Sequence, residues 1–128
     1  MNNKISKKEK GKRAEALAEK YFISKGFEIV ERNFRTKTGE IDLILKRESL
    51  LVFVEVKSTF GSQNFISEEK VDRIKQKKIL TSAKFFWLKN YQKFSKIREI
   101  RFDVVVINLK NGELKHYESA FSEEISFY

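Results

Sequence analysis

Two acidic residues within apolar segments are the first candidates for chemistry. Asp42 lies in the run Glu40–Lys46, and Glu55 lies in the run Leu51–Lys57. The four residues between the runs fit the loop of an antiparallel hairpin, and a hairpin centred on this loop pairs Asp42 directly with Glu55. Because strand side chains alternate between faces, we expect both carboxylates on one face of the sheet.

Opposed carboxylates about 5 Å apart on a sheet repel each other, so a cation between them is the simplest reason for the pair. Oxygen ligands suit Mg²⁺ or Mn²⁺, which makes Asp42 and Glu55 the candidate metal ligands. Lys57 shares the face of Glu55, where an ammonium group can stabilise developing negative charge or hold an attacking water. These are the parts of a site for metal-assisted phosphodiester hydrolysis. The spacing equally allows ordinary ion pairs, for example between Glu55 and Lys57.

A third carboxylate, Glu15, lies in a predicted amphipathic helix over residues 7–25. At about 100° per residue it points close to Phe22, at the edge of the apolar stripe. This position is typical of the solvent boundary; the alternative is that Glu15 faces the sheet beside the site.

Several other classes of chemistry are excluded. The chain has no Cys, which rules out thiol catalysis and fits a reducing compartment. His116 is the single His, so a cluster of His ligands is excluded and a structural or solvent-exposed role is expected. Glycine-rich nucleotide loops are absent from the sequence. Asp103 is expected to be a structural ion-pair partner, of Arg101 or of a helix lysine, outside the site.

The elements that must position these residues follow from the apolar periodicity. Strands are predicted over 27–33, 40–46, 51–57, 100–109 and 114–117, and a second helix, capped by Ser67, over 67–91. Strict alternation places Glu40, Asp42 and Ile44 on one face of their strand. It places Ile41, Leu43 and Leu45 on the other face. The apolar stripe of the second helix is expected to include Val71, Ile74, Leu80, Ala83 and Trp87. The order α-β-β-β-α-β-β predicts an α/β fold with a mixed central sheet flanked by helices.

Positive charge is concentrated rather than spread. The net charge is +9, with +5 in residues 1–13 and +9 in residues 70–101, offset by −2 in 14–69 and −3 in 102–128. A concentrated basic segment indicates a polyanion partner such as nucleic acid; the alternative is a solvated helix face. The adjacent Phe85, Phe86 and Trp87 can stack on unpaired bases, although core packing is favoured for at least one of them.

Length and patterning predict a basic, flexible tail over residues 1–10 and a single domain over 11–128. The N-terminal segment has no apolar core of a signal peptide, and no apolar run approaches the 18 or more residues of a membrane span. We therefore expect a cytoplasmic protein without a membrane partner.

The ordered set of motifs resembles the YraN-type family of small bacterial proteins. That family is placed in the restriction endonuclease-like PD-(D/E)XK superfamily and is akin to archaeal Holliday junction resolvases. The resemblance is carried by Gly11-x-x-Ala14-Glu15-x-x-Ala18, Arg32-Asn33-Phe34-Arg35, GEIDLI at 39–44, FVEVK at 53–57, Lys75-Gln76-x-Lys78-x-Leu80 with Ala83, and RFDVV at 101–105.

The resemblance implies roles for these residues. Asp42 and Glu55 would be metal ligands, Lys57 the catalytic lysine, and Glu15 the helix glutamate that completes the site. The basic and amide residues expected to contact nucleic acid are Arg35, Lys75, Gln76 and Lys78. Ile41 replaces the proline of the superfamily name, as is general in the family. Ser58-Thr59 follows Lys57 where the family carries Lys-x-Arg, so one phosphate contact of the family is not expected here.

The expected function is that of a Mg²⁺- or Mn²⁺-dependent endonuclease acting on DNA, including branched or repair intermediates, with no small-molecule cofactor beyond the metal. The first alternative is a nucleic-acid-binding protein that keeps the nuclease fold without cutting. The second is a scaffold whose basic helix meets an acidic partner. Resolvases act as dimers, which leaves a homodimer open, but the sequence identifies no interface for one.

Overall fold

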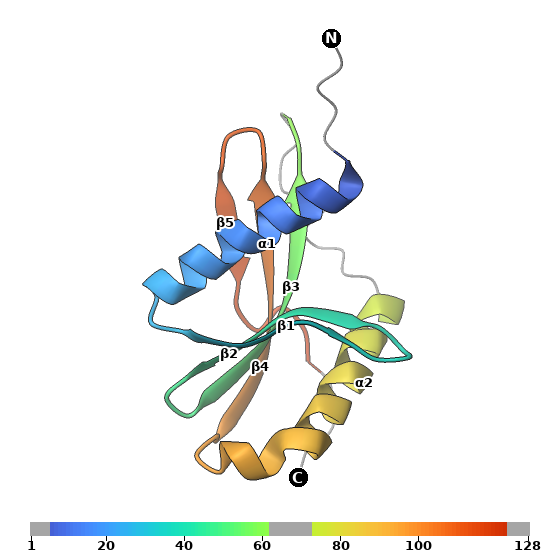
Figure 1. The fold of residues 1–128 in the computed structure, drawn as a ribbon, viewed down its shortest axis with the longest axis vertical. Helices are drawn as coiled ribbons and strands as arrows, with labels where there is room; N and C mark the ends of the chain where they lie inside the picture. The colour runs from blue at the N-terminus through green and yellow to red at the C-terminus, as the bar shows by residue number, and fades with distance from the viewer. Residues whose placement is uncertain (1–5, 62–72, 123–128) are drawn as a thin grey trace.

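The computed structural model describes residues 6–61 and 73–122. Within them the chain forms a helix, three strands, a second helix and two strands (Figure 1). This is the predicted α/β order, which is thereby confirmed. The elements are α1 (Lys7–Ser24), β1 (Glu28–Arg35), β2 (Glu40–Arg47), β3 (Leu50–Thr59), α2 (Arg73–Asn90), a short 3₁₀ helix η2 (Tyr91–Phe94), β4 (Glu99–Asn108) and β5 (Leu114–Tyr117).

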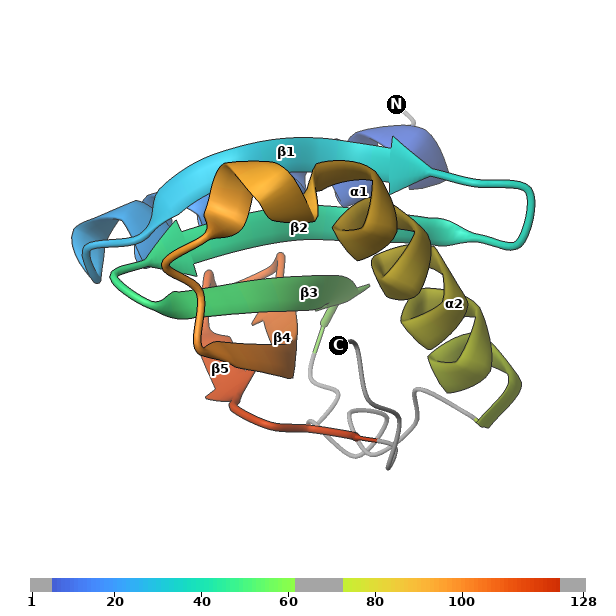
Figure 2. The ribbon, with the colours of Figure 1, turned by 90° about the horizontal axis from the view of Figure 1, so that it is seen from below.

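One mixed sheet forms the centre of the fold, with the strand order β1-β2-β3-β4-β5. The β3–β4 pair is parallel and the other pairs are antiparallel. A parallel pair requires a crossover connection, and here α2 lies within it. Figure 2 shows α1 and α2 on opposite sides of β1 and β2. The sheet is therefore covered by one helix on each face.

Each helix buries its own apolar face against the sheet. Ala14, Ala18 and Phe22 of α1 pack in one cluster with residues of β2, β3 and β4. Residues 79, 80, 83, 86 and 87 of α2 pack in a second cluster on the other face. Neither helix within residues 6–61 and 73–122 combines the length and the hydropathy that a membrane-spanning segment requires.

The first helix begins at Lys7 and so includes the last four residues of the predicted basic tail. The Ser6 side chain accepts a hydrogen bond from the backbone N–H of Glu9 at 3.1 Å, which satisfies one of the free donors of the first turn. The helix ends at Ser24, and Gly26 follows with a φ of 90°, a conformation that glycine adopts without strain.

The hairpin register agrees with the prediction. Leu43 pairs with Val54 and Ile44 pairs with Phe53, and the next step of this register sets Asp42 opposite Glu55. The expected alternation is wrong at Ile41, which packs with Ile44 in the cluster under α2. Ile41 lies before the point where the β2–β3 ladder begins, since the first pair of that ladder joins Leu43 and Val54. Ile41 pairs instead with Phe34 of β1, which follows Asn33 and its φ of 49°.

The second helix also differs from its predicted stripe. Ile74 is 70% exposed, because the part of α2 that packs on the sheet begins five residues later, at Ile79. The predicted cap at Ser67 and the stripe residue Val71 lie outside the described residues. Of the three adjacent aromatic residues, Phe86 and Trp87 are buried and Phe85 is exposed.

Candidate functional site

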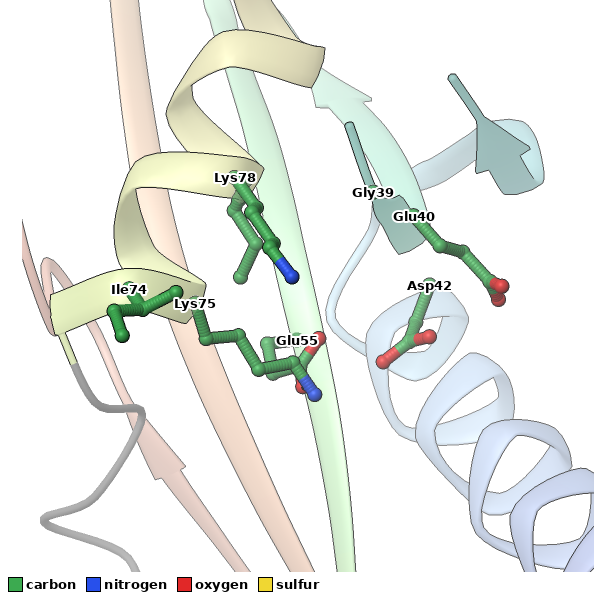
Figure 3. Close-up of a pocket in the computed structure, with 8 residues that line it drawn as sticks. Gly39, Glu40, Asp42, Glu55, Ile74, Lys75 and Lys78 are labelled. Atoms are coloured by element: carbon green, nitrogen blue, oxygen red, sulfur yellow. The ribbon is translucent and has the colours of Figure 1, made fainter. Parts of the chain in front are cut away.

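A pocket of about 500 Å³ opens where β2, β3 and α2 meet. It contains four of the residues that the sequence nominated: Asp42, Glu55, Lys75 and Lys78. The full lining is Gly39, Glu40, Asp42, Glu55, Ile74, Lys75, Lys78 and Ile79. Figure 3 shows the carboxylates of Asp42 and Glu55 turned toward each other, with Lys75 alongside Glu55. The acidic strand residues and the basic helix thus share one hollow.

Asp42 occupies the point where the β2–β3 ladder ends. Its Oδ2 accepts a hydrogen bond from the backbone N–H of Val56 at 2.8 Å, so a side-chain oxygen takes up the β3 donor. Burial, followed by the negative charge of Glu55, raises the pKa of Asp42 to about 8. A hydrogen bond between the two carboxyl groups contributes to the same rise. The pair therefore holds a proton in a position that a metal cation can occupy instead.

Glu55 is 5% exposed, and a lysine of α2 neutralises its negative charge. The Nζ atom of Lys75 lies 2.6 Å from its Oε2 atom. A carboxylate this buried needs a partner of opposite charge, and Lys75 supplies it. Lys75, which the resemblance nominated for nucleic-acid contact, is thus also bound to a candidate metal ligand.

Glu15 faces the site. One carboxylate oxygen from each of Glu15, Glu40 and Asp42 lies within 4.8 Å of the other two. Burial raises the pKa of Glu15, opposed by a hydrogen bond from Asn33 and reinforced by the charge of Glu40. Of the two positions that the sequence left open for Glu15, the structure shows the one beside the sheet. Three carboxylates at this spacing suit a hard cation.

An amide joins two of these carboxylates. The Nδ2 group of Asn33 donates to Oε1 of Glu15 at 3.2 Å and to Oε2 of Glu40 at 3.0 Å. Its left-handed backbone is one that asparagine tolerates better than most residues. Sequence reasoning missed Glu40 and Asn33 as site residues. The available signal for Glu40 was its predicted position on the same face as Asp42.

Arg35 lies at the edge of the same cluster. Its Nε donates to Oε1 of Glu40 at 3.1 Å, and three quarters of its side chain remains exposed. Lys57 is half-buried on β3 opposite Val106. Among the described residues, neither Lys57 nor Gln76 belongs to the lining of the pocket. The structure therefore brings Arg35 to one carboxylate of the cluster, that of Glu40.

Close packing fixes the position of Lys78. A Cβ atom on Gly39 would lie 3.1 Å from the Cβ of Lys78. The backbone of the turn before β2 therefore packs closely against α2, and there is little room for a side chain at position 39. The hydroxyl groups of Thr36 and Ser82 are 2.8 Å apart, and Ser82 is fully buried. The turn and the helix are thereby joined at the pocket rim.

A separate polar network lies under α1. Asp103 is fully buried and binds Arg101 through both carboxylate oxygens at 2.9 Å. Its Oδ2 is also 2.7 Å from His116 Nε2, and His116 Nδ1 is 2.9 Å from the Tyr21 hydroxyl. The expected ion pair with Arg101 is present. Both Asp103 and His116 bind side chains of the fold, apart from the residues that line the pocket.

The family model for the uncharacterised protein family UPF0102 matches residues 14–107. The chain belongs to this family. The resemblance to the YraN-type family is thereby confirmed. The UPF0102 match begins next to Glu15 and runs through β4, so it includes Asn33, Glu40, Asp42 and Glu55.

Curated UPF0102 proteins resemble this chain over most of its length. The protein of Fervidobacterium nodosum is 46% identical over 109 residues, which cover 83% of this chain and 77% of that protein. The protein of Clostridioides difficile is 40% identical over 121 residues, covering 94% of this chain and all of that protein. The protein of Persephonella marina is 38% identical over 112 residues, covering 88% and 92%.

Among solved structures, the following one is similar to this chain in part. It is the structure of Pyrococcus furiosus SfsA in complex with Ca²⁺, with a TM-score of 0.35 and 17% sequence identity. The alignment covers 85% of this chain and 62% of the SfsA chain. A similarity at this level assigns neither a fold nor a function.

Proposed function

We propose that this UPF0102 protein is a metal-dependent nuclease that hydrolyses phosphodiester bonds in DNA. The observation that carries the proposal is the pairing of Asp42 and Glu55 in one pocket with two lysines of α2. Acidic groups that hold a cation, next to basic groups that attract a phosphate backbone, are what such hydrolysis requires.

The carboxylates fit a hard divalent cation such as Mg²⁺ or Mn²⁺. Asp42 and Glu55 would be its first ligands, and Glu15 and Glu40 supply further oxygens next to Asp42. The raised pKa of Asp42 supports this fit, because it shows that the negative charges of the neighbouring Glu55 and Glu15 act on Asp42. A bound cation would compensate these charges. A bound cation would supply Lewis-acid activation of the phosphate and an activated water.

The chain's own residues would position the DNA. Lys78 lies on the pocket rim and Arg35 at the outer edge of the carboxylates, where each can hold a phosphate oxygen. Two lysines compete for the role of stabilising the reacting phosphate. The spacing Glu55-x-Lys57 favours Lys57, whereas Lys75 is the ammonium group in contact with Glu55.

The test is cleavage of single-stranded, duplex and branched DNA in the presence of Mg²⁺ or Mn²⁺. Wild type is compared with Asp42→Asn and Glu55→Gln, which keep side-chain size. Glu113→Gln, an exposed acid outside the pocket, is the matched control. We expect product from the wild type and the control, and none above the metal-free level from the two site variants. Cleavage that survives both site changes would show a contaminating nuclease and refute the assignment.

A second candidate is a DNA-binding protein with the same fold and no catalysis. It is favoured by the ion pairs already present, since Lys75 neutralises Glu55 and Arg35 neutralises Glu40. This candidate predicts DNA binding whose affinity falls steeply as the salt concentration rises, in a plot of the logarithm of the binding constant against that of salt. It also predicts that the wild type and Asp42→Asn give the same heat when titrated with Mn²⁺. Absence of DNA binding at low salt would instead favour an acidic protein partner.

A further inference from the structure

A second hollow adjoins the carboxylates on the other side of the turn before β2. Its volume is about 790 Å³. Two cationic side chains, three threonines and one aromatic ring line it: Arg35, Thr36, Lys37, Thr38, Thr81 and Phe85. Cations, hydroxyl groups and an aromatic face are the groups that hold a nucleotide by its phosphate and its base.

Phe85 is the aromatic ring of this hollow. It is 58% exposed, whereas its neighbours Phe86 and Trp87 are buried in the core beneath α2. A single exposed apolar side chain is common in proteins and needs no explanation by itself. Phe85 differs from such a residue because it lines one hollow together with two cationic side chains, next to the candidate metal pocket.

The walls of the hollow are fixed in advance. The Oγ1 atom of Thr36 lies 2.8 Å from the hydroxyl of Ser82 on α2 and accepts hydrogen bonds from the backbone N–H groups of Thr38 and Gly39 at 3.1 and 3.2 Å. The turn and the helix are therefore held together by a buried side chain. A site whose walls are already in place loses little entropy when a ligand binds.

An ion pair connects the hollow to the carboxylate pocket. Arg35 lines the hollow and binds Glu40, which lines the pocket. Lys78, Thr81 and Phe85 follow one another at helical spacing on one face of α2. The distance from Lys78 to Phe85 along the helix axis is about 10 Å at 1.5 Å per residue. This equals roughly three steps of a stacked DNA strand at about 3.4 Å per base.

We propose that Phe85 is a stacking platform for an unpaired nucleobase, and that Arg35 and Lys37 bind the phosphates beside that base. A phenyl ring can stack on the face of a base only when the base is not enclosed in a duplex. Stacking of this kind tolerates any base, because every base has a π face. Resting on the proposed nuclease function, this assigns DNA with a single-stranded segment about three nucleotides from the cleaved bond as the substrate class.

The experiment measures binding without cleavage, using the full chain in EDTA. The probes are a fluorescein-labelled oligo(dT) strand and a blunt duplex of the same length. Phe85→Ala is expected to weaken oligo(dT) binding by about 5- to 150-fold, the effect of losing one base–aromatic stack. Phe85→Trp is expected to retain the wild-type affinity for oligo(dT) within about twofold. The affinity of Phe85→Ala for the duplex is also expected to stay within about twofold of the wild-type value. Phe85→Leu keeps an apolar side chain without a π face and is expected to behave like Phe85→Ala.

Leu88→Ala is the matched control, because Leu88 is 69% exposed on the same helix and lines a different pocket. Its affinity for oligo(dT) is expected to equal that of the wild type. Unchanged oligo(dT) binding by Phe85→Ala, or an equal loss for oligo(dT) and duplex, would overturn the platform. Full affinity of Phe85→Leu would show a general apolar contact instead, and would overturn it too.

The outcomes for the platform and for the nuclease are separable. If the wild type cleaves no DNA while Phe85→Ala loses oligo(dT) binding, the nuclease proposal fails and the platform stands. If cleavage depends on Asp42 while Phe85→Ala binds as the wild type does, the platform alone is wrong.

Discussion

Lys75 of α2 lies 2.6 Å from Glu55 of β3 and places the positive charge of the helix directly on a buried carboxylate. Glu55 is nearly inaccessible, while about half of the Lys75 side chain remains exposed. The lysine side chain can therefore leave the pair by rotating into solvent, whereas the Glu55 side chain is enclosed by the protein. A divalent cation that binds Glu55 has to share it with this ammonium group or displace it.

Lys75→Met is expected to strengthen Mn²⁺ binding. Removal of the ammonium relieves about 1.4 kcal/mol of repulsion toward a divalent ion, which corresponds to about a tenfold lower dissociation constant. Isothermal titration calorimetry measures this directly. Lys77→Met, on the same helix but outside the pocket lining, serves as the control and should bind Mn²⁺ as the wild type does. Weaker Mn²⁺ binding by Lys75→Met would mean that the lysine positions Glu55 for the metal.

Mn²⁺ is expected to stabilise the folded protein through Asp42. A ligand at 100 times its dissociation constant adds about 2.7 kcal/mol to the free energy of unfolding. Urea denaturation with and without Mn²⁺ measures this increment. Asp42→Asn should lose most of it, and Glu113→Gln should keep it. An equal increment in Asp42→Asn would place the metal elsewhere.

Asn33 is expected to act on the metal site through Glu15 and Glu40, which its amide joins. Asn33→Gly keeps a residue suited to the φ of 49° and removes the side chain with its amide. Residues that orient metal ligands typically contribute 10- to 100-fold to metal affinity, and we expect a loss in this range, measured by Mn²⁺ calorimetry.

Asn33→Ala separates the amide from the backbone. It should show the same loss of Mn²⁺ affinity as Asn33→Gly, together with about 1 kcal/mol lower stability, because alanine is strained at positive φ. If Asn33→Gly bound Mn²⁺ as the wild type does, the amide would have no part in ordering the carboxylates.

Asp103 is expected to make stability fall in acid. Burial alone would raise its pKa, but hydrogen bonds from His116, Arg101 and the backbone of Ser119 outweigh burial and hold the pKa of Asp103 below its ordinary value. A carboxylate with a lowered folded pKa stabilises the protein above the unfolded pKa, and this contribution is lost as pH falls below about 4.

Asp103→Asn tests this network. The change removes the two charge-assisted hydrogen bonds from Arg101, which keeps Glu118, at 3.5 Å, as an anionic partner. We expect a loss of about 1.5–3 kcal/mol in the free energy of unfolding at pH 7. Denaturant titrations between pH 3 and pH 7 should show a smaller acid-induced loss in the variant than in the wild type. Parallel pH profiles for the two proteins would assign the acid sensitivity to other groups.

The sequence predicted the parts of the site that depend on local geometry. The hairpin register follows from loop length and strand alternation, so the facing positions of Asp42 and Glu55 could be read directly. The roles of Glu40 and Asn33 could not be read in this way, because Glu40 lies beyond the end of the β2–β3 ladder and Asn33 has a left-handed backbone within β1. The contact of Lys75 with Glu55 depends on how the helix crosses the sheet, which periodicity does not describe.

The parallel β3–β4 pair sets the order in which the site can assemble during folding. The β1–β2–β3 meander consists of local contacts, which form quickly, whereas β3 meets β4 only after a long stretch of chain has closed. A chain with the meander alone has its acidic residues together and no lysines above them. Lys75 and Lys78 reach the pocket only when the crossover closes and lays α2 over the sheet. The juxtaposition of acidic and basic groups is therefore a property of the complete fold and not of the meander.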